Sequence, residues 1–143
     1  MALRIDLALD CADPKRLAEF WKLALGYVDE PPRPPFATRQ EWLKHHGVPE
    51  EEWDMGAWLC DPAGVGPRLF LQGVPEPKVA KNRLHMDVRV PGDGDAEQRW
   101  ARITEMAERL TVAGATTLEQ FAGRHVLMAD PEGNEFCVCG GPG

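Results

Sequence analysis

The spacing of apolar residues predicts two amphipathic helices and a series of short strands. Residues 14–25 carry an apolar stripe at helical intervals that begins with Leu17, and Asp13 and Gly26 are residue types suited to its two ends. Residues 95–113 carry a second stripe of the same kind. Runs in which apolar and polar residues alternate predict the strands, which lie at 3–11, 55–60, 67–74, 84–90, 116–121, 124–130 and 134–139, with a short one near Tyr27.

The order of these elements repeats. A strand, a helix and three further strands occur once in about residues 1–76 and again in about residues 82–143. "RIDLAL" at 4–9 aligns with "RLHMDV" at 83–88, so that Asp6 falls opposite His85, and the turn "DPAG" aligns with "DPEG". Such duplication predicts a single α+β domain of 1–143 made from two βαβββ modules, with the helices on one face of the strands.

The first module contains an insertion that the second lacks. It begins with "PPRPP", which suits neither a helix nor a central strand. "TRQE" follows with the spacing of a capping box, and it predicts a short helix that carries Trp42 and Leu43 and ends at Gly47.

Composition and charge exclude several classes of protein. The chain has 143 residues, a net charge of −7 and a pI near 5.1, and this acidity argues against nucleic acid and anionic membranes as partners. Arg4, Asp6 and Asp10 interrupt the first ten residues, where an export signal would need an apolar stretch, so we expect a cytoplasmic protein. The four cysteines lack C-x-x-C spacing and are interpreted as free thiols.

The stretch "RLHMDV" raises a chemical question, because a core strand rarely carries both a histidine and an aspartate. Alternation places Leu84, Met86 and Val88 on the helix side, and it places His85 and Asp87 together on the other side with Arg89. One interpretation is that these are satisfied polar residues within the core. The other is that this face of the strand lines a cavity.

Three segments resemble the glyoxalase, bleomycin-resistance and extradiol-dioxygenase superfamily, also called the vicinal oxygen chelate proteins. They are "DCADPKRLAEFWKLALGY", "KNRLHMDVRV" and "VLMADPEGNEFCV", in this order. The whole chain looks most similar to the small glyoxalase-like domains. The resemblance implies that the modules form a curled mixed sheet around a ligand cavity, with the helices outside.

The resemblance also implies positions for a metal site, because metal-dependent members place one ligand on the first strand and one on the last strand of each module. On the first strands of the two modules, these positions are Asp6 and His85. On the last strands, they are Cys137 in the second module and Gln72 or Phe70 in the first. Such a set is poor for a divalent ion, and zinc would suit it best. We therefore expect no resident metal, and His85 near Asp6 is the alternative general base.

Two functions follow from these observations. The first is a small-molecule binding protein whose cavity is lined by Asp6, Trp58, Phe70, Gln72, His85, Asp87 and Cys137. The second is a lyase, isomerase or dioxygenase that uses a divalent metal or His85 with Asp6 as its catalytic residues. The resemblance also makes a homodimer plausible, whereas the ligand and the presence of any catalysis stay open.

Overall fold

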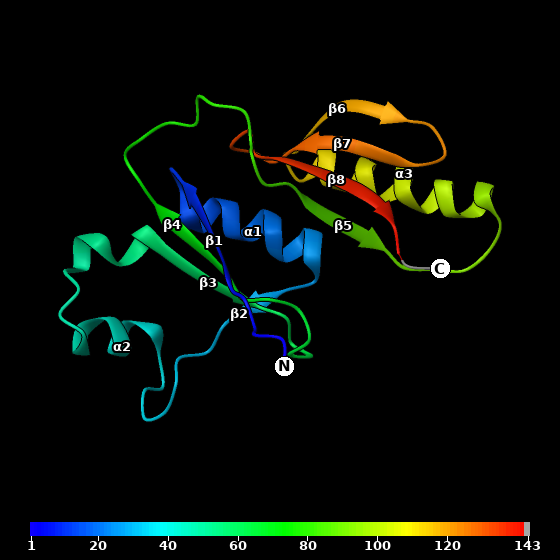
Figure 1. Ribbon diagram of the computed structural model, residues 1–143. Helices are drawn as coiled ribbons and strands as arrows, with labels where there is room; N and C mark the ends of the chain where they lie inside the picture. The colour runs from blue at the N-terminus through cyan, green and yellow to red at the C-terminus, as the bar shows by residue number, and fades with distance from the viewer. Residues whose placement is uncertain (142–143) are drawn as a thin grey trace. The chain divides into compact units, whose positions relative to one another are not determined.

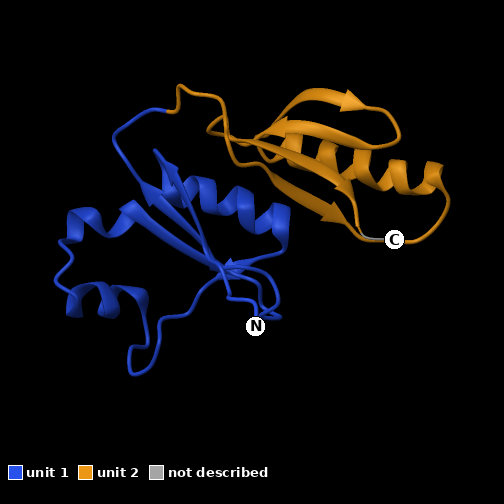
Figure 2. Ribbon diagram, viewed as in Figure 1, with its two compact units in different colours: residues 1–77 blue, residues 78–143 orange. Residues whose placement is uncertain are grey.

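The computed structural model describes residues 1–141 of the chain, which divides into two compact units, Met1–Pro77 and Lys78–Gly143 (Figure 2). Each unit contains one four-stranded mixed sheet, here called sheet A in the first unit and sheet B in the second. Hydrogen bonds therefore group the strands into two sheets, where the sequence had suggested one curled sheet. No helix within residues 1–141 is long and apolar enough to cross a lipid bilayer.

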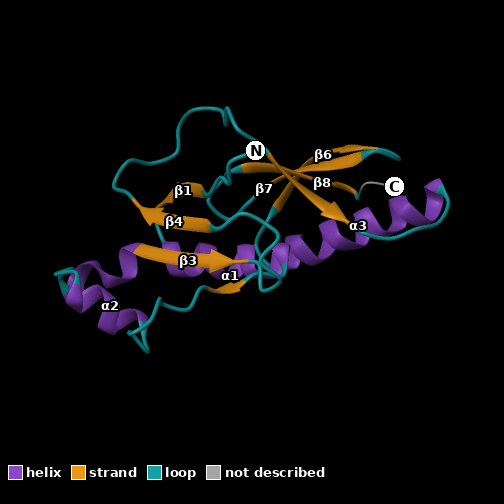
Figure 3. Cartoon of the chain, turned by 60° about the horizontal axis from the view of Figure 1, so that its bottom comes forward, coloured by secondary structure: helices purple, strands orange, loops and turns teal. Residues whose placement is uncertain are grey.

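The first unit has the strand order β1-β4-β3-β2 in sheet A (Figure 1). Strand β1 runs parallel to β4, while the other two pairs of neighbouring strands are antiparallel. A 3₁₀ helix, η1, leads directly into β3, as Figure 3 shows. The elements are β1 (Leu7–Cys11), α1 (Pro14–Leu25), β2 (Val28–Asp29), α2 (Arg39–His45), η1 (Glu50–Met55), β3 (Gly56–Cys60) and β4 (Leu69–Gly73).

The second unit repeats this arrangement without the insertion. Its strand order is β5-β8-β7-β6, and β5 runs parallel to β8 as β1 does to β4. The predicted α+β fold of two βαβββ modules is thereby confirmed. The elements are β5 (Met86–Val90), α3 (Ala96–Val112), β6 (Thr116–Phe121), β7 (His125–Ala129) and β8 (Glu135–Gly140).

One helix covers one face of each sheet and forms a hydrophobic core there. In the first unit, Leu17 and Trp21 of α1 are buried with Leu59 and Leu71 of the sheet. Burial of each such side chain contributes roughly 1.5–3 kcal/mol. In the second unit, α3 packs on β7 and β8. Its buried residues are Ile103, Ala107 and Leu110, and those of the sheet include Val126, Met128, Phe136 and Val138.

The helix ends follow the predicted signals. The Asp13 side chain accepts a hydrogen bond from the Arg16 amide, and Gly26 closes α1 in the left-handed conformation at φ 69°. The insertion helix α2 begins with the predicted capping box, in which Thr38 and Glu41 bond to each other's backbone amides.

The first strand of each module begins later than predicted. β1 starts at Leu7 and β5 at Met86, so Ile5 and Leu84 lie before the strands and are 69% and 70% exposed. The prediction that Leu84 faces the helix is therefore wrong. In the first unit, the parallel ladder begins where the Leu7 amide donates to the Arg68 carbonyl oxygen at 2.9 Å.

Candidate functional site

The face of sheet A that α1 does not cover, here called the open face of sheet A, presents side chains in rows. Paired residues on neighbouring strands point to the same side, and one row contains Ala8, Phe70 and Trp58. The next row contains Asp10 and Gln72, which also pair. Of these five residues, Phe70 and Trp58 are half-buried and the other three are exposed.

Aromatic rings stack along the first row. The centroids of Phe70 and Trp58 are 5.1 Å apart with an interplanar angle of 27°. The Arg39 guanidinium lies 4.3 Å from the Trp58 centroid, and Trp42 approaches Trp58 edge-on at 5.9 Å. Protein groups thus surround Trp58, whereas Phe70 borders the small, exposed Ala8.

Arg39 is fixed in this position by the insertion and by the sheet. It is the first residue of α2, and its Nη2 donates to the Glu30 carbonyl oxygen at 3.0 Å. Burial lowers its pKa, although Glu30 partly opposes this shift. The sequence offered no sign of Arg39, because its role depends on how the insertion folds back over Trp58.

Gly56 makes room for the aromatic pair. A Cβ atom at this position would lie 2.9 Å from the Trp58 ring and 3.1 Å from the Phe70 ring. Both rings therefore lean over the Gly56 backbone, which only a residue without a side chain permits.

An ion cluster borders the aromatic row. Arg68 donates from Nη2 to Glu30 at 2.9 Å, also contacts Glu30 through Nε, and lies 3.3 Å from Asp6 through Nη1. These hydrogen bonds, with that of Glu30 the strongest, raise the pKa of Arg68. The carboxylate of Asp6 is thus engaged by a cation of its own unit.

The open face of sheet B, which α3 does not cover, carries polar residues and thiols. Asp87 of β5 pairs with Cys137 of β8, and Arg89 pairs with Cys139. Burial raises the pKa of both thiols, which favours their protonated form. The predicted alternation holds within β5, since Val88 is buried while Asp87 and Arg89 are exposed.

His85 stands immediately before β5, and its Nε2 lies 3.3 Å from Glu135 Oε2. Lys81 pairs with the same carboxylate, and this contact is the main cause that lowers the pKa of Glu135. Sequence reasoning missed Glu135. Its position two residues before Cys137, on the same face of the last strand, was the signal that could have found it.

The strand register settles which residue of β4 corresponds to Cys137. Ala8 and Asp87 occupy equivalent positions, two residues after Asp6 and His85. Ala8 pairs with Phe70 and Asp87 pairs with Cys137. Phe70 is therefore the equivalent residue, and Gln72 corresponds to Cys139.

The model of the Glyoxalase-like domain matches residues 6–139, which is nearly the whole chain. The chain belongs to this glyoxalase-like family. No curated protein matches the sequence. Among solved structures, the fosfomycin resistance protein FosX from Mesorhizobium loti has a TM-score of 0.65 at 11% identity, covering 99% of this chain and 94% of that one. A possible glyoxalase from Bacillus cereus has a TM-score of 0.59 at 17% identity, with 97% and 99% covered.

A hypothetical protein from S. aureus is similar to the same degree, with a TM-score of 0.59, 13% identity and 99% of both chains covered. A variant of FosX from Listeria monocytogenes, with a TM-score of 0.63 and 10% identity over 99% and 94% of the two chains, was solved with Mn(II) and 1S,2S-dihydroxypropylphosphonic acid. At these identities the likenesses show the fold of the glyoxalase-like chain.

The residues at the implied metal positions do not suit a divalent ion. Phe70 has no donor atom, Cys137 is a thiol with a raised pKa, and Asp6 and His85 each have a protein partner. Within either unit, the described residues contain no group of three or more His, Cys, Asp or Glu side chains that could hold a metal ion. These positions therefore offer a divalent ion too few suitable donor atoms.

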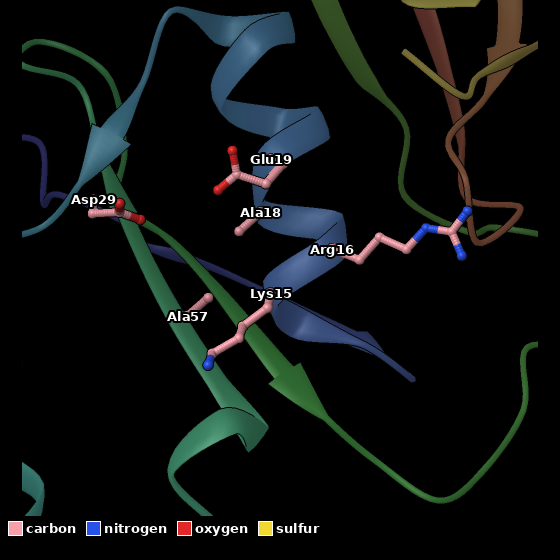
Figure 4. Close-up of a pocket in the computed structure, with 6 residues that line it drawn as sticks. All are labelled: Lys15, Arg16, Ala18, Glu19, Asp29 and Ala57. Carbon is pink, nitrogen blue, oxygen red and sulfur yellow. The ribbon is translucent and has the colours of Figure 1, made fainter. Parts of the chain in front are cut away.

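A surface depression of about 470 Å³ lies elsewhere in the first unit, between α1 and the strands β2 and β3 (Figure 4). Its charged groups already have partners: Lys15 pairs with Asp54 at 2.5 Å, and Glu19 and Asp29 both pair with Lys22. Arg16 extends away from the centre of the depression. Because these groups neutralise one another in solvent, the depression is a weaker candidate than the open faces.

Proposed function

We propose that this protein binds a flat organic molecule on the open face of sheet A, with a ring of the ligand stacked on Phe70 above Ala8. The observation that carries the proposal is the stack of Arg39, Trp58 and Phe70, which holds a half-buried aromatic ring beside a small exposed residue. Aromatic stacking gives about 0.5–1.5 kcal/mol beyond the burial of area.

Polar side chains surround this surface and would orient the ligand. Asp10 and Gln72 lie in the next row, and Asp6 lies on the other side beside Arg68. A mainly apolar contact with a few polar groups at its border is the usual composition of small-molecule sites.

Family membership supports the proposal. FosX from Listeria monocytogenes, a similar structure, was solved with a small organic phosphonate. In the present chain Trp58 supports the ring of Phe70 from behind, and the ligand contacts Phe70 itself.

A panel of aromatic compounds tests the proposal through thermal stabilisation and tryptophan fluorescence, since Trp58 adjoins Phe70. We expect a compound that raises the melting temperature, and we expect Phe70→Ala to weaken its binding about tenfold or more.

Phe121→Ala is the matched control, because Phe121 is a half-buried strand aromatic in the other unit, stacked on His125 at 4.5 Å. Equal loss of binding in the two variants, or no loss in Phe70→Ala, would contradict a site at Phe70.

A second candidate function rests on the contact between His85 and Glu135. A carboxylate that holds one imidazole nitrogen leaves the other available as a proton acceptor, which suits a lyase or isomerase that acts without a metal. Compounds of the same panel, incubated with the protein in D₂O, distinguish the two functions. Deuterium incorporation that His85→Gln abolishes would favour the enzyme, whereas unchanged compound favours the binding protein.

A further inference from the structure

Two side-chain contacts occupy equivalent places in the two units, and the carboxylate lies on the first strand side in one and on the last strand side in the other. In the first unit, Asp6 before β1 lies 3.3 Å from Arg68 before β4. In the second unit, His85 before β5 lies 3.3 Å from Glu135 at the start of β8. The register makes Arg68 and Glu135 equivalent, because each is the residue before the pair of Leu7 with Leu69 or of Met86 with Phe136.

Each pair belongs to a larger charge network. Arg68 joins Asp6 to Glu30, and Glu135 joins His85 to Lys81. In the first network Glu30 is the least exposed side chain at 19%, and in the second it is Glu135, also at 19%. Asp6 and His85 thus each have a partner within their own unit.

A cation beside a carboxylate competes with a metal ion for it. Mn(II) or Zn(II) at Asp6 would lie close to the positive guanidinium of Arg68, which repels it. In the second unit, Lys81 would repel a cation near Glu135 in the same way. The last-strand positions do not compensate, because they hold Phe70 and the thiol of Cys137.

We propose that Arg68 and Glu135 replace a metal ion as the partners of Asp6 and His85, so that this glyoxalase-like protein holds both first-strand residues without a divalent cation. The inference does not depend on the proposed ligand site. It makes Arg68 a positioning residue that also excludes metal from the carboxylates of Asp6 and Glu30.

Titration with Mn(II) alone, followed by the electron paramagnetic resonance of the free ion, tests this proposal. We expect the wild-type protein to leave the free Mn(II) signal unchanged. Arg68→Gln removes the competing cation and leaves two adjacent carboxylates, so we expect it to gain saturable Mn(II) binding, which Asp6→Asn in the same variant abolishes.

Lys15→Gln is the matched control, because it removes a cation from a single surface carboxylate, Asp54, and should gain no saturable site. Circular dichroism verifies that each variant is folded, and Arg68→Lys, which keeps the charge, is used if Arg68→Gln unfolds and must still exclude Mn(II). Stoichiometric binding by the wild-type protein would overturn the proposal. Folded Arg68→Gln that binds no Mn(II) would overturn the role of Arg68.

Discussion

Gly56 is the residue on which the aromatic row depends most directly. Since its Cα lies under both rings, Gly56→Ala should displace Trp58 and Phe70, destabilise the fold by about 1–2 kcal/mol and change the tryptophan emission. Chemical denaturation followed by fluorescence measures both effects.

Gly140→Ala provides the comparison for this substitution. Gly140 also lies on a strand, but an added Cβ would approach no atom nearer than Ile103 Cδ1 at 4.0 Å. We expect Gly140→Ala to leave stability unchanged or slightly raised. If both variants lost the same stability, the close approach of the rings to Gly56 would not be the cause.

Glu135 gives the stability of the protein a dependence on acid pH. Its pKa is lowered from the ordinary 4.5, chiefly by Lys81, so its ionised form stabilises the fold above about pH 4.5. That contribution is lost as the pH falls through the lowered pKa of the folded state.

Lys81→Met should therefore raise the pKa of Glu135 towards 4.5, as a carboxyl carbon titration by NMR would measure. The melting temperatures of wild type and variant should differ most near neutral pH and converge in acid. A difference that widens below pH 4.5 would contradict the assignment.

Individual site residues could be predicted only where the alternation along a strand determines which face of the sheet they lie on. Phe70, Gln72 and Trp58 have a face that follows from period two along a strand. Arg39 and Glu135 could not be ranked in this way, because their importance comes from partners 19 and 50 residues away, Trp58 and His85.

The two helices that begin with a capping box, α2 and α3, differ in how much they contribute to stability. α3 has 17 residues and three buried side chains, whereas α2 has seven residues and buries only Leu43. Loss of a cap therefore has a global effect in one helix and a local effect in the other.

Asp95→Ala should lower the free energy of unfolding by about 1 kcal/mol, because Asp95 caps α3. Thr38→Ala should leave global stability nearly unchanged but speed hydrogen exchange in α2, which carries Arg39. Hydrogen exchange and thermal denaturation of both variants measure the contrast. Equal losses of global stability would show that α2 is part of the cooperative core.

The sequence predicted the ends of the helices more accurately than the ends of the strands. The signals for α1 are local, and Asp13, Pro14 and Gly26 lie at its ends as expected. A strand begins where its partner can bond to it, so the start of β1 at Leu7 depends on the carbonyl of Arg68, far along the chain.

The duplication was the most informative feature of the whole chain. Two aligned segments predicted an α+β fold with two similar modules, and the strand orders β1-β4-β3-β2 and β5-β8-β7-β6 confirm it. The grouping of strands into two separate sheets was not predictable, because alternation identifies strands but not which edges remain unpaired. No pattern in the sequence identifies the ligand either, because the fold alone does not determine it.

The carboxylate lies on opposite strands in the two equivalent contacts, so Arg68 and Glu135 are not interchangeable. A recombinant that exchanged Arg68 with Glu135 would set two carboxylates, Asp6 and the new glutamate, against each other beside Glu30. It would also place a guanidinium against His85 and Lys81. Each module therefore requires the cross-strand partner that its own sequence supplies.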